Sequence, residues 1–108
     1  MKLKDLISIA GLSLLSGNEN RELDGCYIGD LLSLAMSKVE KDNVWITIQS
    51  NINIVAVASL TEAGCIIICE GFDPDEGVIL RAKNEDIAIA KSPLSAFELS
   101  KILIQNGF

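Results

Sequence analysis

Polar side chains that could bind a small ligand gather at two points of the sequence, each directly after an apolar run. Gln49, Ser50 and Asn51 follow one run, and Lys91 and Ser92 follow another. Hydroxyl, amide and ammonium groups donate hydrogen bonds to carboxylates and phosphates, and a helix N-terminus beside them adds free N–H groups and a favourable dipole. The pattern therefore predicts a site for a small anion, although ordinary helix capping also explains Ser50, Asn51 and Ser92.

No set of residues predicts catalysis. The chain contains no histidine, which excludes Ser-His-Asp and Cys-His mechanisms and histidine-ligated metals. Neither GxGxxG nor GxxxxGK followed by Ser or Thr occurs, so the common nucleotide-binding loops are absent. Asp73, Asp75 and Glu76 lie close in sequence, but a capped, proline-initiated helix explains them without a metal. We predict no catalytic residue, no metal site and no cofactor.

The three cysteines are Cys26, Cys65 and Cys69. An odd number in a chain rich in apolar residues does not indicate a secreted disulfide framework. Cys65 and Cys69 bracket an apolar β-branched run, and in a strand their Cα atoms lie about 13 Å apart. That separation is too long for a shared zinc ion or a disulfide. We predict two buried core thiols in a protein of the reducing cytoplasm.

Length and charge limit the remaining possibilities. A chain of 108 residues with 49% hydrophobic residues is expected to form one domain over residues 1–108. Nine basic against fifteen acidic residues give a net charge of −6, which disfavours nucleic acids and anionic membrane surfaces as partners. No apolar run approaches the roughly 18 residues of a membrane span.

The first half of the chain predicts two helices and three extended segments. Apolar spacing gives a helix from Leu3 to Ala10, closed by Gly11. The expected extended segments are 12–15, 21–28 and 44–48, with a turn at 16–20. The second helix starts near Asp30, and its buried side is expected to consist of Leu31, Leu34, Ala35 and Val39.

The second half alternates helices and strands. The segment 51–63 is ambiguous, because its β-branched residues suit a strand, but its length and the cap at Ser50 or Asn51 favour a helix. Strands are expected at 65–69 and 87–90. The cap-then-proline pairs Asp73-Pro74 and Ser92-Pro93 predict the starts of the last two helices. The expected core residues of those two helices are Val78, Ile79, Ala82, Ala96, Leu99, Ile102 and Leu103.

This alternation predicts the fold class. Right-handed crossovers between successive strands give an α/β protein with three α/β/α layers around a central, mainly parallel sheet of about five strands. Ligands bind such sheets beyond the carboxyl ends of the strands. Segments 49–51, 70–73 and 91–93 should therefore meet at one edge, although the acidic residues of 70–76 argue against a phosphate at the middle loop.

The segment 20–33 resembles the DRTGG domain, named for a short motif at this place. Arg21 and Gly25 match the motif, while Asn20, Asp24 and Cys26 depart from it. The likeness extends to the opening Lys-rich helix and to segments 45–49, 53–60 and 92–98. Asp30 lies within the same resembling segment.

The resemblance implies a stand-alone domain of a family that also occurs beside phosphotransacetylase or CBS-containing pyrophosphatase domains. The family is similar in fold to the N-terminal domain of HPr kinase/phosphorylase, and its members imply regulation or self-association. A serine-kinase assignment by that similarity would be unsupported, because the phosphate-binding loop lies in a domain that this chain lacks.

Two hypotheses follow. The first is a non-catalytic regulatory module that associates with itself as a homodimer, while any further protein partner is unidentified. The alternative is a sensor that binds a small anionic metabolite, a nucleotide or an acyl phosphate, at the strand-end loops. The residues of interest are Gln49, Ser50, Asn51, Lys91 and Ser92 for the ligand, and Arg21, Gly25 and Asp30 for the motif.

Overall fold

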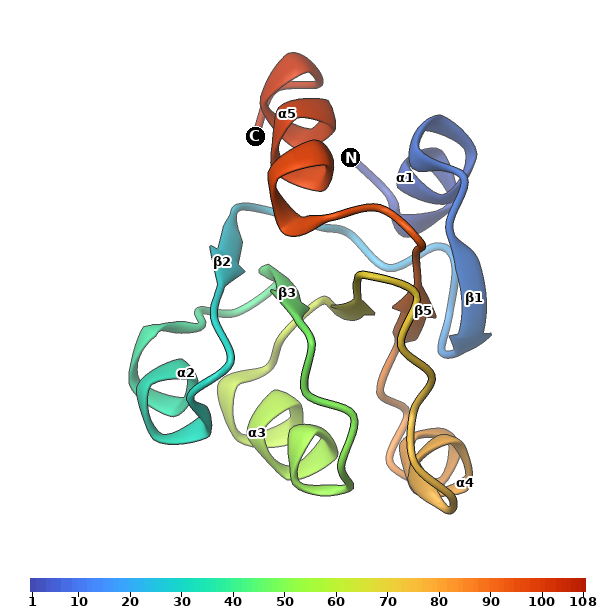
Figure 1. The fold of residues 1–108 in the computed structure, drawn as a ribbon, viewed down its shortest axis with the longest axis vertical. Helices are drawn as coiled ribbons and strands as arrows, with labels where there is room; N and C mark the ends of the chain where they lie inside the picture. Colours follow the sequence, from blue (N-terminus) through green and yellow to red (C-terminus); the bar gives the residue numbers. More distant parts are fainter.

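The computed structural model describes residues 1–108, which form a five-stranded sheet between two layers of helices (Figure 1). In chain order the elements are α1 (Leu3–Ala10), β1 (Ser13–Ser16), β2 (Cys26–Ile28), α2 (Leu32–Lys38), β3 (Val44–Thr47), α3 (Asn53–Thr61), β4 (Cys65–Ile68), α4 (Val78–Asn84), β5 (Ile89–Lys91) and α5 (Ala96–Gln105). The predicted three-layer α/β/α architecture is confirmed.

The strand order across the sheet is β1-β5-β4-β3-β2. Strands β2 to β5 are parallel, and only β1 runs antiparallel, beside β5. Helices α1 and α5 cover one face, while α2, α3 and α4 cover the other, and β1 and β2 form the two lateral edges (Figure 1). The sheet is therefore mainly parallel, as the alternating sequence predicts.

The central strands are hydrophobic on both sides because helices cover both faces. Every residue of β3 and β4 is buried. Their alternate side chains divide between a cluster of 14 buried residues under α2, α3 and α4 and a cluster of 13 under α1 and α5. Cys65 and Cys69 belong to the second cluster, which confirms their predicted place in the core.

The expected start of α4 at Asp73-Pro74 is wrong. The helix begins at Val78, after Gly77 in a left-handed conformation with φ of 85°. The preceding loop stays extended because it makes tertiary bonds: Asp75 N donates to Ser50 O at 2.8 Å, and the Asp73 carboxylate pairs with Lys91. These contacts outweigh the local capping pattern.

The expected start of α5 at Ser92-Pro93 is wrong by three residues. Ser95 is the N-cap, and it forms a capping box with Glu98. Ser92 is instead buried, and its Oγ accepts a bond from Leu94 N at 3.1 Å. The sequence thus holds two cap candidates, and the packing of the strand end selects the second.

The predicted buried side of α2 is half correct. Ala35 and Val39 are buried, whereas Leu31 and Leu34 are exposed. Helix α2 lies at the β2 end of the sheet and has a neighbouring helix, α3, on one side only (Figure 1). A helix in that position buries a narrower stripe than a central one. The ambiguous segment 51–63 contains α3, which confirms the helical prediction.

No helix of this structure is both long enough and apolar enough to cross a membrane.

Candidate functional site

The loops after β3, β4 and β5 meet at the carboxyl edge of the sheet, as predicted. Ser50 Oγ donates to Asp75 Oδ1 at 3.1 Å, so the first loop contacts the second. Gly71 N donates to Ser92 O at 2.9 Å, which joins the second loop to the third. Parallel strands that end at one edge thus bring together residues that are far apart in sequence.

The predicted ligand-binding side chains bond to the protein itself. Gln49 Nε2 donates to Asp30 O at 2.9 Å, and Asn51 Nδ2 donates to Gln49 Oε1 at 3.1 Å. Lys91 Nζ pairs with the Asp73 carboxylate. The Oδ1 of Asn51 also accepts from the N of Asn53, and thereby serves the first turn of α3. The polar groups of this edge form a connected network within the chain.

The electrostatics of this edge are dominated by acids. The loop 70–76 carries four carboxylates, and Asp30 adds a fifth after β2. Lys91 is the cation among these loops, and Asp73 already neutralises it. None of the five surface cavities is lined by Gln49, Ser50, Asn51, Lys91 or Ser92. An anionic ligand here would have to displace bonds that the loops make with one another.

Asp30, one of the three residues selected for the motif, lies at this edge and joins two strands. Its Oδ1 accepts from Thr47 Oγ1 and from Ile48 N, both at 2.8 Å. Both donors stand at the end of β3, so the carboxylate fixes the end of β2 against its neighbour. Burial raises the pKa of the Cys69 thiol, and the nearby carboxylates of Glu70 and Asp30 also favour its neutral form.

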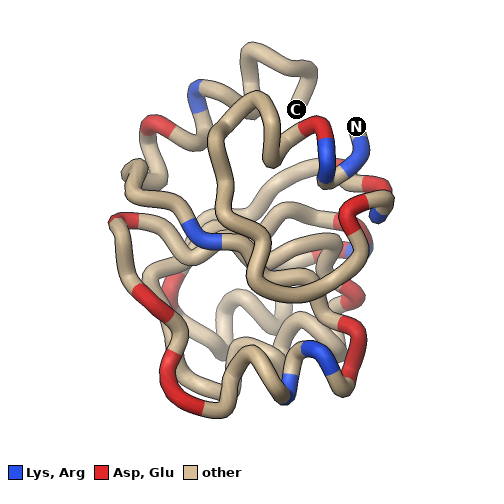
Figure 2. The backbone as a smooth tube through the Cα atoms, turned by 90° about the vertical axis from the view of Figure 1, so that its right-hand side faces the viewer, with Lys and Arg blue, Asp and Glu red and all other residues tan.

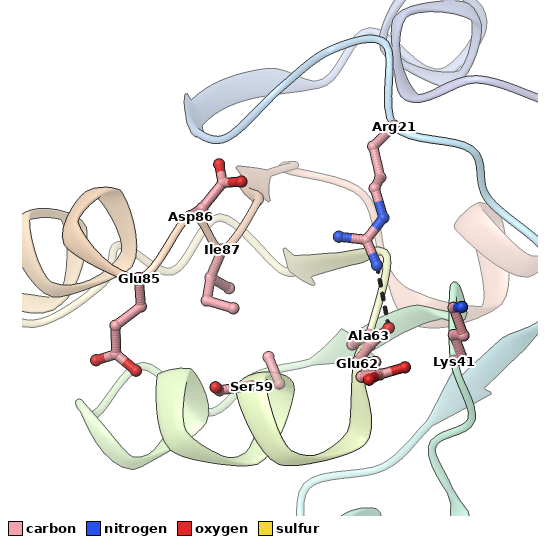
Figure 3. A pocket seen from close by; sticks show the side chains of 9 residues that line it. Arg21, Lys41, Ser59, Glu62, Ala63, Glu85, Asp86 and Ile87 are labelled. Carbon is pink, nitrogen blue, oxygen red and sulfur yellow. Dashed lines mark hydrogen bonds between the residues drawn. The ribbon is translucent and has the colours of Figure 1, made fainter.

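Arg21 lies at the opposite, amino edge of the sheet. Its Nη2 donates to Asp42 Oδ1 and to Glu62 O, both at 3.2 Å (Figure 3). Glu62 is the C-cap of α3 and adopts a left-handed conformation with φ of 58°. The guanidinium therefore places a positive charge at the negative end of the α3 dipole and links the segment before β2 to two other turns.

A polar cavity of about 340 Å³ surrounds the Arg21 guanidinium. Figure 3 shows Arg21 pointing toward Glu62 at the end of α3, with Ser59 further back on the helix and Glu85 and Asp86 on the opposite side of the cavity. The complete lining is Arg21, Lys41, Ala58, Ser59, Glu62, Ala63, Glu85, Asp86 and Ile87. Sequence reasoning missed this cavity, because it is built from the segments before four different strands. Its lining mixes both charges and contains a single hydroxyl, that of Ser59.

Gly25 is required by the backbone at the start of β2. Its φ is 76°, and a Cβ there would stand 2.8 Å from Asn43 Nδ2. That Nδ2 donates to Asp24 O at 2.8 Å, while Asn43 Oδ1 accepts from Glu40 N. The side chain of Asn43 is thus held from two sides and leaves no room for a larger residue at position 25.

An apolar groove of about 370 Å³ lies between β2 and α5. Its lining comprises Cys26, Tyr27, Ile28, Ser100, Leu103, Ile104 and Phe108. Partial burial in this groove raises the pKa of the Cys26 thiol to about 11, and full burial raises that of Cys65 to about 12. All three cysteines are free thiols, and no group of three or more Cys, Asp or Glu side chains is arranged to hold a metal ion.

Acidic residues surround these sites. In Figure 2 red segments occur on both flanks of the tube, while blue segments are fewer and scattered. The net charge of −6 is therefore distributed over both ends of the strands. The molecule offers two acidic edges, a polar cavity at Arg21 and an apolar groove at β2.

Comparison with known proteins gives one family and one fold. The model of the DRTGG domain family matches residues 5–105. A solved structure of the CBS and DRTGG domains from the regulatory region of Clostridium perfringens pyrophosphatase, complexed with its activator diadenosine tetraphosphate, superimposes with a TM-score of 0.78 at 16% identity. The match covers 96% of this chain but only 46% of that one, so this chain spans less than half of that regulatory region. No curated protein matches the sequence significantly.

Proposed function

Because the chain belongs to the DRTGG domain family, we propose that it is a non-catalytic regulatory module that works by associating with a second copy of itself. The observation that carries the proposal is the contrast between its surfaces. Polar side chains of the carboxyl edge bond to one another, whereas Ile28, Leu31, Leu34 and Ile104 leave large apolar surfaces uncovered near β2. Contiguous apolar surface on a small protein marks a contact with another molecule.

Sedimentation velocity at micromolar concentrations tests the association. We expect a species of twice the 11.6 kDa chain mass, in equilibrium with the monomer as the protein is diluted. A sample that stays monomeric at every concentration up to the solubility limit would contradict self-association.

A second candidate function is the sensing of a small anionic metabolite at the carboxyl-edge loops. Its support is that the similar pyrophosphatase regulatory region was crystallised with diadenosine tetraphosphate, together with the hydroxyls and the ammonium group of Ser50, Ser92 and Lys91. A ligand present at a hundred times its dissociation constant stabilises a protein by about 2.7 kcal/mol. For a domain of this size that corresponds to roughly 10 °C or more in Tm.

A thermal-shift screen therefore separates the two functions. The probes are diadenosine tetraphosphate, ATP and acetyl phosphate. A shift that disappears in Lys91→Ala and Ser50→Ala supports the sensor at these loops, and a shift that persists in both variants places the ligand elsewhere. If none of the probes raises Tm, the regulatory module that associates with itself remains the proposed function.

The remaining assignments belong to the same proposal. We propose that residues 1–108 act as one domain of the cytoplasm, that their fold is similar to the N-terminal domain of HPr kinase/phosphorylase, and that the chain has no turnover of its own. Support for the last point is that Ser59, the single hydroxyl among the residues that line the Arg21 cavity, donates no hydrogen bond to a carboxylate or an amine there. ATP hydrolysis by pure protein at a rate proportional to its concentration would contradict it.

A further inference from the structure

Strand β2 has one free side. It pairs only with β3: Val44 N donates to Gly25 O at 3.0 Å, and Gly29 N donates to Ile46 O at 3.1 Å. Backbone groups alternate in direction along a strand, so Cys26 and Ile28 point their N–H and C=O groups away from the sheet. Two donors and two acceptors therefore line an open sheet edge.

This edge lacks the usual protection against pairing. Natural edge strands carry charges or prolines, or are covered. Residues 25–29 read Gly-Cys-Tyr-Ile-Gly, without charge or proline. No strand lies beyond β2 (Figure 1), and α5 leaves the apolar groove open beside it.

The helices on both faces continue the apolar surface. On α2, the residues Leu32, Ser33 and Met36 face α3, and a rotation of 100° per residue puts Leu31 and Leu34 on the opposite side, which faces outward at the β2 end of the sheet. On α5, Ile104 lines the groove, and Phe97 lies two turns before it on the same stripe. The apolar strip of the β2 side is defined as Ile28, Leu31, Leu34, Phe97 and Ile104.

The area of this strip suits a protein contact. Its five side chains are between 44% and 81% exposed, which leaves on the order of 500 Å² of apolar surface at roughly 150–200 Å² per side chain. A standard interface buries about 800 Å² per partner, of which about 55–65% is apolar. The strip therefore supplies the apolar part of one side of such an interface.

We propose that a second copy of this chain pairs with β2 in antiparallel orientation across a twofold axis, so that two five-stranded sheets join into one of ten strands. The inference rests on the proposed self-association and specifies its surface. Only one register pairs both residues whose backbone groups face outward with such residues of the other copy. In this register Cys26 of each copy lies opposite Ile28 of the other, and the axis passes between the two Tyr27 residues.

Charge complementarity favours a second copy as the occupant. Lys38 lies on the same outward side of α2 as Leu31 and Leu34, at the end of the helix, while Asp30 precedes its start. Lys38 forms no ion pair within the chain. The twofold axis sets the two α2 helices antiparallel, so Lys38 of each copy approaches the Asp30 end of the other.

The register gives a sharp cross-linking test. In the proposed dimer, positions 26 and 28 of opposite copies have Cα atoms about 5.5 Å apart, within disulfide range. The two Cys26 residues are more than about 8 Å apart, which is too far. Oxidation should therefore link Ile28→Cys into a covalent dimer and leave the wild type unlinked. Peptide mapping should identify the bond between positions 26 and 28.

Matched variants control this result. Adding Cys26→Ser to Ile28→Cys should abolish the link, since position 28 then faces a serine. Leu80→Cys, on exposed α4 far from β2, should not link. If Ile28→Cys remains unlinked in a sample that sediments as a dimer, or if the bond joins other positions, the β2 pairing is overturned while self-association stands.

A second variant tests the interface without a substitution in β2. Ile104→Glu adds a like charge to each copy on exposed α5 and should raise the dimer dissociation constant at least tenfold, whereas Leu80→Glu should leave it unchanged. Equal effects of the two variants overturn the proposal. A wild type that is monomeric throughout overturns both the pairing and the proposed function. A monomer that binds an unrelated extended peptide at β2 overturns the choice of occupant.

Discussion

At the residue scale, each of the three motif residues contacts and stabilises a segment that is distant in the sequence. Arg21 bonds two turns at the amino edge, Gly25 admits the packed side chain of Asn43, and Asp30 fixes the ends of β2 and β3. Their types could be recognised in the sequence, but their contacts could not. Each contact joins segments at least 17 residues apart, and no local pattern encodes such a pairing.

Arg21→Ala should lower the free energy of unfolding by about 1–2 kcal/mol. The half-exposed ion pair with Asp42 contributes about 0–1 kcal/mol, and the charged hydrogen bond to Glu62 O adds about as much or more. Urea unfolding measures the loss. Lys41→Ala serves as the control, because Lys41 lines the same cavity without an ion pair, and it should change stability by less than about 0.5 kcal/mol. If both variants lost the same free energy of unfolding, the hydrogen bonds of Arg21 would not stabilise the fold as proposed.

Gly25 and Gly71 form a matched pair for a second prediction. Their φ angles are 76° and 75°, but a Cβ at Gly25 would meet Asn43 Nδ2, whereas one at Gly71 meets nothing within 4 Å. Gly71→Ala should cost about 1 kcal/mol for the left-handed backbone alone. Gly25→Ala should cost at least about 1–2 kcal/mol more, since Asn43 must move and lose bonds. Similar midpoints of thermal unfolding would contradict the crowding at Asn43.

At the element scale, the sequence determines which segments become helices better than where each helix starts. Segment 51–63 was predicted to be helical from its length and caps, and α3 confirms it. Asp73-Pro74 and Ser92-Pro93 have the local form of helix starts, yet both lie in loops whose backbone groups bond across the carboxyl edge. Where tertiary bonds compete with a cap, single-sequence patterns give the wrong boundary.

Ser95→Ala should destabilise the protein by about 1 kcal/mol, the usual contribution of an N-cap. Its Oγ accepts from Glu98 N at 3.1 Å, and the Glu98 carboxylate accepts in return from Ser95 N. Chemical denaturation of the variant gives the measurement. Ser37→Ala is the control, because Ser37 Oγ only donates to a carbonyl on an exposed helix side and should be close to neutral. If Ser95→Ala left the stability unchanged, Ser95 would not be the N-cap of α5, and the predicted cap at Ser92 would stand.

At the scale of the whole molecule, the α/β architecture was predictable because it depends on the order of elements. Continuous apolar runs such as residues 65–69 indicate strands covered on both faces, and their alternation with helices fixes the parallel sheet. The cavity at Arg21 was not predictable, since it exists only where the segments before four strands converge. The exposure of Leu31 was missed for a related reason: the sequence does not say which helix lies at the end of the sheet.

The buried Cys65 thiol and the partly buried Cys26 thiol make global stability depend on alkaline pH. Burial raises the pKa of Cys65 from 9.0 to about 12 and that of Cys26 to about 11. The unfolded chain releases these protons near pH 9 while the folded chain retains them, so the stabilisation is present below that pH and is lost as pH rises toward 11–12. The buried Cys65 thiol lowers stability by up to about 1.4 kcal/mol per pH unit in this range, and the more exposed Cys26 thiol lowers it by less because solvent screens its charge.

Urea midpoints at about pH 8.5 and about pH 10.5 measure this loss, by linkage of proton release to unfolding. Cys65→Ala should be less stable than wild type at the lower pH, because it leaves a small cavity, but it should lose less on going to the higher pH. Parallel declines in the two proteins would show that other groups carry the alkaline transition.

The antiparallel strand β1 has a consequence for the way the molecule is made. It joins the sheet only through β5, with Ser13 opposite Lys91, so the first strand of the sheet to be synthesised pairs with the last. Strands β2, β3 and β4 can associate as they emerge from the ribosome, whereas β1 must wait, unpaired, until β5 has been synthesised. The sheet is therefore closed only after β5 has emerged, and a nascent chain stalled before residue 89 carries its first strand unpaired.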